Sequence, residues 1–230
     1  MSALVVLYAD PFWVSPYVFS SFVALREKNI DFEVITIDLT KGDHQREPFR
    51  SASLTARVPA LDDHGFWLSE SNAIAEYLEE SYPPPAHQRL FPADPRQRAR
   101  ARQLMAFLRS DLGPLRDERS SEMVFYQMSG QPLSTSARRS VTKLIEVAEQ
   151  LLAGGAETAF DEWSVADADL ALALRRIAQD GDLLPPRLRV CRPPMAAPFG
   201  ARLRRSPARA LRSLQKRRLR PPGGAVSATI

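Results

Sequence analysis

Two short segments of this 230-residue chain contain residue types that suit the recognition of a small, extended, peptide-like ligand. The first is an apolar, strand-like run interrupted by Pro59. Proline cannot donate a hydrogen bond to a β-ladder, and one good reason to place it there is a cis bond in a tight turn. Such a turn would leave the N–H and C=O of Val58 free to pair with an extended ligand, as an added strand does. An edge strand with nothing bound is the alternative.

The second segment, Glu70-Ser71, opens a run whose apolar residues recur at helical spacing, which predicts a helix over Ser71–Tyr82. The first turn of a helix offers unpaired N–H groups and the positive end of the helix dipole, so it can hold a carboxylate. Taken alone, Ser69 or Ser71 could be an ordinary N-cap. Taken together, the two segments favour a peptide-like ligand with a free carboxylate.

A third segment, Ser15-Pro16-Tyr17-Val18, could act on a thiol. A serine N-cap followed by proline at the first helical position is its purely structural interpretation. The tetrapeptide also resembles the Cys-Pro-Tyr-Cys of glutaredoxins with both cysteines replaced. Because the sole cysteine is the distant Cys191, dithiol exchange is impossible here, and any reacting thiol must come with the ligand. A serine hydroxyl at a helix start could donate to that sulfur, and the dipole would favour the thiolate.

The order of these motifs resembles that of the glutathione S-transferase family, most closely its bacterial YfcF type, over about residues 1–182. The matching segments, in chain order, are Leu4–Tyr8, Ser15–Tyr17, Arg57–Pro59, Leu68–Leu78, Leu90–Pro92, Arg98–Gln103, Leu108–Leu112 and Trp163–Leu172. The resemblance implies a thioredoxin-like N-terminal domain followed by a helical C-terminal domain. It also implies glutathione as co-substrate, no other cofactor, and a homodimer.

The resemblance further implies a role for each candidate residue of the glutathione site. Ser15 would activate the thiol. The main chain of Val58, presented by Pro59, would pair with the cysteinyl part of glutathione. Glu70 and Ser71 would hold the γ-glutamyl amino and carboxylate groups.

Other candidates have stronger competing explanations. Tyr8 ends the first strand, where some glutathione transferases have a catalytic tyrosine, and it is the rival of Ser15. Lys41 and His44 lie in the segment that often reaches the glycyl carboxylate, although loop side chains of these types are more often merely solvated. The candidates for a hydrophobic co-substrate site are Phe12, Trp13 and Tyr17, for which core packing is an equal alternative.

Alternating strand and helix patterns predict an α/β domain over residues 1–82. The expected elements are Leu4–Tyr8, Pro16–Asn29, Phe32–Ile37, Ala60–Asp62, Phe66–Leu68 and Ser71–Tyr82. A stiff, proline-rich linker follows over residues 83–93. An all-helical domain is expected over residues 94–182, with helices beginning at Asp94-Pro95, Thr135 and Val165 and a break at Gly113-Pro114. Ser164 and Asp167 resemble a capping box and are interpreted as structural.

The composition of the chain argues against several classes of protein and of binding site. The chain has no apolar run of about 18 residues, so no membrane span is expected. A start directly in strand residues and a single cysteine favour the cytoplasm. The three histidines are scattered and have no cysteine partners, so no metal site is expected. Alternate arginines at positions 96–102 scatter around a helix, which favours a solvated surface over a binding patch.

The last 48 residues differ in composition from the rest. Residues 183–230 contain 12 Lys and Arg, eight Pro and no acidic residue, whereas all 27 acidic residues lie in residues 1–182. Such a segment is typical of disordered chains. We expect a frameshifted or replaced end, which would leave the helical domain incomplete. A tail that binds nucleic acid without sequence specificity is the rival, and reading the gene in its other frames past the codon for Asp182 would decide.

The sequence therefore predicts a transferase in which a glutathione thiolate attacks an electrophile or reduces a hydroperoxide. A non-catalytic module that binds glutathione or a protein on the same fold is the alternative, because fold does not fix function.

Overall fold

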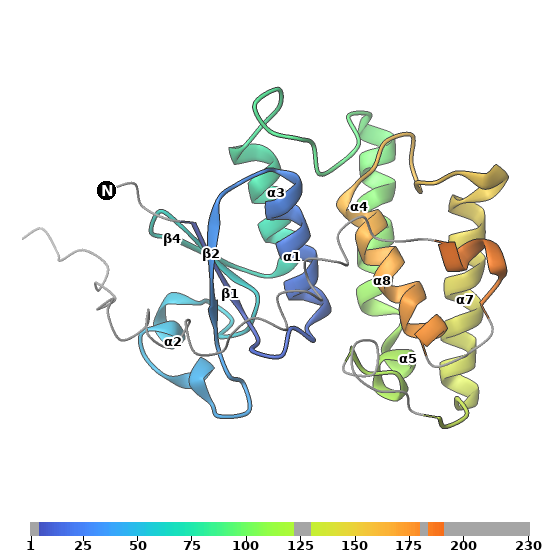
Figure 1. Cartoon of the computed structure of the whole chain (residues 1–230), viewed down its shortest axis with the longest axis horizontal. Helices are drawn as coiled ribbons and strands as arrows, with labels where there is room; N and C mark the ends of the chain where they lie inside the picture. Colours follow the sequence, from blue (N-terminus) through green and yellow to red (C-terminus); the bar gives the residue numbers. More distant parts are fainter. Residues whose placement is uncertain (1–4, 122–129, 180–183, 191–230) are drawn as a thin grey trace, which may run out of the picture.

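The computed structural model describes residues 5–121, 130–179 and 184–190. Its N-terminal half contains a four-stranded sheet flanked by helices (Figure 1). The elements are β1 (Val5–Ala9), α1 (Pro16–Glu27), β2 (Phe32–Thr36), the short helices η1 (Asp43–Gln45) and α2 (Phe49–Ala52), β3 (Ala60–Asp63), β4 (Phe66–Ser69) and α3 (Ser71–Ser81). The predicted elements are confirmed to within one or two residues at their ends, and Leu4 lies outside the described residues.

The strand order is β2-β1-β3-β4, with β1 parallel to β2 and antiparallel to β3. The parallel pair follows from the crossover through α1, and the antiparallel pair β3–β4 from a tight hairpin. Helices α1 and α3 lie between the sheet and the C-terminal helices, whereas α2 lies on the other side of the sheet (Figure 1). Val18, Phe22 and Leu25 of α1 are buried, as expected for apolar residues at helical spacing.

The C-terminal half is helical. Its elements are α4 (Pro95–Ser110), α5 (Gly113–Glu118), α7 (Thr135–Leu151), η2 (Ala153–Gly155), α8 (Val165–Gln179) and η3 (Pro186–Val190). The predicted break at Gly113-Pro114 is confirmed, because α4 ends before it and α5 begins there. The fold is therefore a thioredoxin-like domain followed by a helical domain. None of the described helices combines the length and apolar character needed to cross a membrane.

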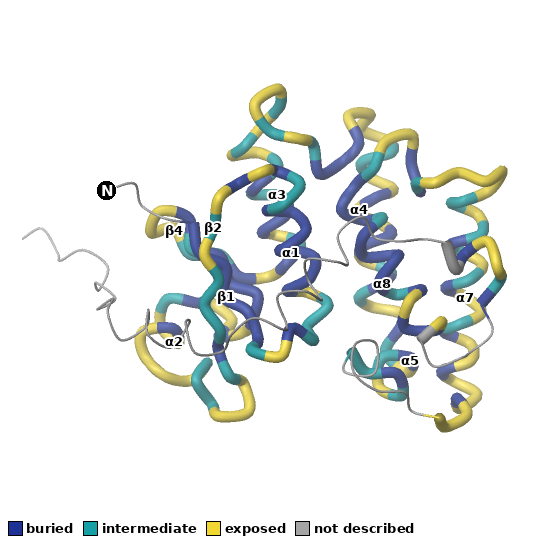
Figure 2. Tube along the Cα trace, in the orientation of Figure 1, coloured by how far each residue is buried: buried dark blue, intermediate teal, exposed yellow. Residues whose placement is uncertain are grey.

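Helix α8 forms the centre of the helical half. It packs against α4, α7 and α1, and its apolar residues are buried on several sides (Figure 2). The carboxylate of Asp167 accepts hydrogen bonds from the N–H of Ser164 at 2.8 Å and from its hydroxyl at 2.9 Å. Burial raises the pKa of Asp167, and these hydrogen bonds oppose the shift. The predicted capping box thus holds the start of the buried helix.

The linker is anchored to both halves, which its proline content does not predict. Lys28 is fully buried and pairs with Glu79 at 2.6 Å. The Glu79 carboxylate also accepts from the N–H of Leu90 at 2.8 Å. The carbonyl of Leu90 accepts from the N–H of Val165 at 2.9 Å, and the side chains of Leu90 and Phe91 are buried. The linker is therefore part of the core between the halves.

Candidate active site

Asp10 organises the loop between β1 and α1. It is 5% exposed, and its Oδ1 accepts from the N–H groups of Phe12 at 3.1 Å and Val14 at 3.0 Å. Its Oδ2 accepts from the N–H of Ser15 at 3.1 Å. The sequence analysis missed Asp10. The available signal was an aspartate directly after a buried strand, since aspartate often bonds the main chain just beyond it in turns.

Ser15 sits at the N-cap of α1 with extended backbone angles, and Pro16 follows in the first turn. Its Oγ accepts from the N–H of Val18 at 3.2 Å, so the capping interpretation is confirmed. Because that bond uses the oxygen as acceptor, the hydroxyl proton can still be donated to a ligand. Ser15 is half-buried and lines a cleft at the positive end of the α1 dipole.

Val58 and Pro59 line the same cleft as Ser15. The Val58–Pro59 peptide bond is cis, as predicted. No hydrogen bond joins the Val58 main chain to another residue in the described part of the chain. The N–H and C=O of Val58 can therefore pair with an extended ligand in the cleft, which has a volume of about 530 Å³.

Glu70 and Ser71, at the start of α3, also line this cleft. Glu70 is the N-cap but makes no side-chain capping bond, so the first N–H groups of α3 are not satisfied by a cap. Its φ of 72° lies in the region that glutamate rarely adopts, and backbone strain of this kind clusters at ligand sites. The sequence contained no signal for this backbone conformation.

The helical half reaches the cleft through Arg109 of α4. Its Nη2 donates to the hydroxyl oxygen of Ser71 at 3.1 Å, and its Nη1 pairs with Asp169 of α8 at 2.8 Å. Asp169 is 9% exposed, and burial raises the pKa of its carboxyl against the opposing charge of Arg109. Sequence reasoning did not assign Arg109 a role, because its partners lie far away in the chain.

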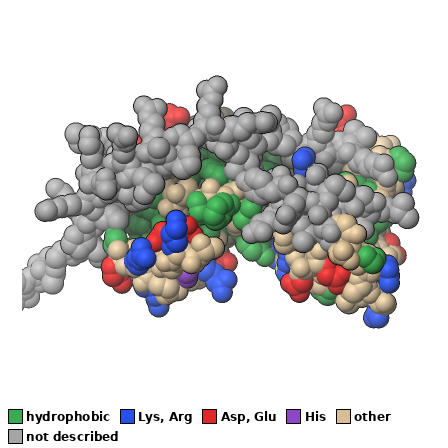
Figure 3. Space-filling model, turned by 60° about the horizontal axis from the view of Figure 1, so that its bottom comes forward, with side chains coloured by type: hydrophobic (Ala, Val, Ile, Leu, Met, Phe, Trp, Pro, Cys, Tyr) green, Lys and Arg blue, Asp and Glu red, His purple; other side chains and the backbone are tan. Residues whose placement is uncertain are grey.

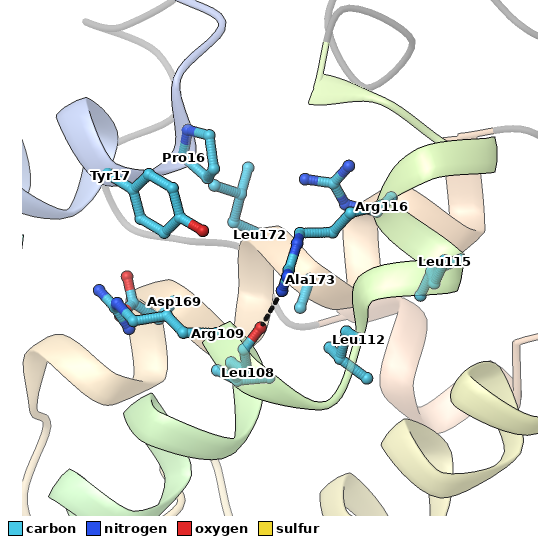
Figure 4. Close-up of a pocket in the computed structure, with 11 residues that line it drawn as sticks. Pro16, Tyr17, Leu108, Arg109, Leu112, Leu115, Arg116, Asp169, Leu172 and Ala173 are labelled. Carbon is cyan, nitrogen blue, oxygen red and sulfur yellow. Dashed lines mark hydrogen bonds and ion pairs between the residues drawn. The ribbon is translucent and has the colours of Figure 1, made fainter. Parts of the chain in front are cut away.

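A second, mostly apolar pocket adjoins the cleft on the side of the C-terminal helices (Figure 4). Pro16 and Tyr17 form one side, and residues of α4, α5 and α8 form the rest. The apolar lining residues from these helices are Leu108, Leu112, Leu115, Leu172 and Ala173. Tyr17 and Arg109 line both the pocket and the cleft, and the Arg109 Cζ lies 5.7 Å from the centre of the Tyr17 ring. On the face shown in Figure 3, hydrophobic side chains gather where the two lobes meet.

Of the three proposed co-substrate residues, the structure brings only Tyr17 to this pocket. Trp13 is buried, and its ring packs edge-on against Phe22 with 5.5 Å between centroids, as the core-packing alternative predicts. Phe12 is 53% exposed and is not among the lining residues described.

Three other candidates lie outside the lining of the cleft. Tyr8 is 3% exposed and stacks on Trp67 with 4.6 Å between ring centroids. Lys41 is exposed and its Nζ lies 3.1 Å from an Asp38 oxygen. His44 is half-buried in η1. Their predicted roles remain predictions. Among the described residues, no group of His, Cys, Asp and Glu side chains is arranged to hold a metal.

Comparisons with known proteins agree with this geometry. Residues 14–81 match a model of the glutathione S-transferase N-terminal domain, and residues 94–192 match one of the C-terminal domain. The second match continues past residue 182, where we expected the resemblance to stop, and Leu184 and Leu188 are buried. The remaining tail, residues 191–230, lies outside the described residues.

Similar proteins cover most of the chain. A glutathione transferase homologue from Burkholderia, solved with bound glutathione, is 38% identical with a TM-score of 0.69, covering 87% of this chain and 96% of its own. Maleylacetoacetate isomerase of Rattus norvegicus is 34% identical over 65% of this chain and 68% of its own. A bacterial maleylpyruvate isomerase of the zeta class is 28% identical, has a TM-score of 0.61, and is covered over 88% of its length and 80% of this chain. With its cis Val58–Pro59 bond, its serine at the start of α1 and both domain matches, the chain belongs to the glutathione S-transferase family.

Proposed function

We propose that this protein is a transferase in which the Ser15 hydroxyl donates to the sulfur of bound glutathione and stabilises its thiolate. The observation that supports this most directly is one cleft lined by Ser15, the Val58 main chain and the uncapped start of α3. The cysteinyl part of glutathione pairs with Val58 there. The γ-glutamyl end lies at Glu70 and Ser71, where helix N–H groups and Arg109 compensate its carboxylate.

The second substrate occupies the adjoining pocket, on the far side of Tyr17. The thiolate attacks an electrophilic carbon, forming a C–S bond as the leaving group departs with its electron pair. With a hydroperoxide, the sulfur attacks the terminal oxygen, the O–O bond breaks and the alkoxide leaves as the alcohol; a second glutathione then reacts with the resulting glutathione sulfenic acid to give the disulfide and water. The cleft supports either reaction, and the pocket supplies the apolar surroundings that a small electrophile or peroxide requires.

Replacing Ser15 by alanine tests the thiolate role. Ser15→Ala should raise the pKa of the bound glutathione thiol, measured by thiolate absorbance against pH, and lower turnover while glutathione affinity changes little. Each pKa unit corresponds to about 1.4 kcal/mol of thiolate stabilisation. Tyr8→Phe is the matched control and should have the smaller effect. Full activity in Ser15→Ala with loss in Tyr8→Phe would reverse the assignment.

A non-catalytic glutathione-binding module is the second candidate. It is favoured if calorimetry shows glutathione binding while no electrophile, hydroperoxide or mixed disulfide is turned over. The YfcF-type subclass is likewise a proposal, based on the Ser15-Pro16-Tyr17 segment. The zeta-class relatives are its rival, and isomerisation of a maleyl substrate would support them.

The assembly and boundaries are also proposals. Leu54 is 90% exposed and Phe66 is 50% exposed, so the N-terminal half presents apolar side chains suited to a homodimer contact. Light scattering on Leu54→Asp should show a shift toward monomer. We retain an N-terminal domain at residues 1–82 and a linker at 83–93, and place the end of the helical domain, which begins at residue 94, after η3 rather than at residue 182. A cytoplasmic location is proposed from the single cysteine.

A further inference from the structure

Two guanidinium groups in the pocket beyond Tyr17 have no acidic partner in the described part of the chain. The described lining residues include Arg109, Arg116 and Arg176 but only one carboxylate, that of Asp169. Asp169 already pairs with Arg109 at 2.8 Å. The positive charges of Arg116 and Arg176 are therefore in excess.

Arg176 is buried although its side chain is charged. It is 5% exposed, and its nitrogens donate to the carbonyl of Arg119 and, at 3.1 Å, to the hydroxyl of Ser121. These neutral acceptors satisfy hydrogen bonds but do not compensate the charge. Burial, and then the charge of Arg116, lower the pKa of Arg176 to about 10, so the group still holds its proton at neutral pH. A buried charge without a counter-charge is costly, and an anion entering the pocket would offset that cost.

Arg116 supplies a second positive group from another helix. It comes from α5, is half-buried, and donates through Nη1 to the carbonyl of Leu108 at 3.0 Å (Figure 4). Arginine presents several N–H donors in a planar fork that suits a carboxylate, so its remaining donors can bind one.

The arrangement of the lining residues also defines how a substrate is oriented in the pocket. Pro16 and Tyr17 stand on one side, next to Ser15 in the chain, and Arg116 stands on the opposite side (Figure 4). In this view Leu172 of α8 lies between them, and Leu108 and Leu112 lie along another side of the pocket (Figure 4). A substrate that places its reacting atom near Ser15 can therefore direct its other end toward Arg116 of α5 (Figure 4).

We propose that the co-substrate is an apolar electrophile with a carboxylate, which Arg116 and Arg176 bind in this pocket. This inference rests on the proposed function and adds the chemical class of its second substrate. In the reaction, the glutathione sulfur bonds to the electrophilic carbon and the leaving group departs with its electron pair. The carboxylate is not changed, and it serves only to bind and orient.

A matched pair of aryl halides tests the proposal. A chlorodinitrobenzoate and its methyl ester differ in charge but share the reacting carbon, and each rate is divided by the uncatalysed rate with free glutathione. The wild-type kcat/KM should favour the acid over the ester. Arg116→Met should lower this acid-to-ester ratio by about tenfold or more, as expected for a charge-assisted contact. Arg139→Met removes one exposed charge from α7 and should leave the ratio unchanged.

The outcomes separate the two proposals. Turnover of both compounds without preference for the acid, or an unchanged ratio in Arg116→Met, overturns the carboxylate inference and leaves the transferase function standing. If neither compound is turned over although glutathione binds, and hydroperoxides and mixed disulfides are not turned over either, the transferase function fails. Calorimetry with an aromatic carboxylate and its amide then still tests the pocket, because equal binding of the two by wild-type protein would overturn the inference. Arg176→Lys, which keeps the charge, should retain more of the preference than Arg176→Met.

Discussion

The glutathione cleft and the pocket beyond it share a wall at Tyr17 and Arg109 but are built differently. The cleft consists of turns and helix starts, and much of it is main chain: the Val58 amide and the first N–H groups of α3. The pocket consists of side chains from α4, α5 and α8, which are far apart in the sequence. Main-chain recognition leaves a compact motif that can be recognised in the sequence. Side-chain recognition sets specificity and depends on how helices pack.

The contact between the two regions should be the most sensitive point. Asp169→Leu would leave the half-buried Arg109 without its acidic partner, and we expect a cost at or below the lower end of the roughly 3–5 kcal/mol for breaking a fully buried ion pair. Urea denaturation should show a loss of that size in the free energy of unfolding. Arg109→Met combined with Asp169→Leu should recover part of it. The exposed pair Lys143–Asp111 is the control, and Lys143→Met should cost about 1 kcal/mol or less.

Ser71 tests whether the cleft depends on the helical half. Ser71→Ala removes a hydroxyl at the start of α3 and the acceptor for Arg109, so glutathione affinity should fall by about tenfold or more. Ser81→Ala, at the exposed end of the same helix, is the matched control for calorimetry. Unchanged affinity in both Ser71→Ala and Glu70→Ala would mean that glutathione does not bind at this end of the cleft.

Asp10 tests the positioning of Ser15. Asp10→Ala leaves N–H groups of the loop without their acceptor, and we expect a loss of about 1–3 kcal/mol in the free energy of unfolding. The pKa of the bound glutathione thiol should rise as the hydroxyl is displaced. Asp10→Asn retains one acceptor oxygen, so its free energy of unfolding and the thiol pKa measured in it should lie between the values of wild type and Asp10→Ala. A thiol pKa that stays at the wild-type value in Asp10→Ala would show that the loop positions Ser15 without it.

The smallest effect is expected at Asp38 in the loop of Lys41, since neither side chain is among the described lining residues, although Leu39 of the same loop lines the cleft. Hydrogen bonds from Thr40, and then Lys41, lower the pKa of Asp38 from its ordinary 3.8 to about 2. A carboxyl whose pKa is lower in the folded state stabilises the protein above its unfolded pKa. That contribution is lost as pH falls from about 4 to 2. Asp38→Asn should flatten this part of the acid denaturation profile, while the midpoint of glutathione binding at neutral pH stays as in wild type.

The sequence predicted those features that short segments determine. The cis Pro59 turn, the cap at Ser15, the break at Gly113 and the box at Ser164 each depend on neighbouring residues, and all four are present. These features also establish the thioredoxin-like and helical halves, because they mark where the elements begin and end.

The features that were missed depend on distant partners. Arg109 gains its role from Ser71 and Asp169, and Lys28 is buried only because Glu79 and the carbonyl of Tyr82 approach it. Arg176 belongs to the helix predicted from Val165, whose first residues were interpreted as structural, and no sequence pattern indicated that it lines the pocket. Local patterns contain no information on such pairings, so the cleft was predictable and the pocket was not.

The anchoring of the linker bears on how ligands enter and leave. Leu90 is hydrogen-bonded to Glu79 of the N-terminal half and to Val165 of the helical half. These two bonds oppose a hinge motion of one half relative to the other. We therefore expect glutathione to enter and leave the cleft, and the second substrate to enter and leave the pocket, without an opening motion of the two domains. Entry and release of ligands would then depend on small motions of surface loops and of the Tyr17 ring, which both regions share, on the nanosecond to microsecond timescale of loop motion.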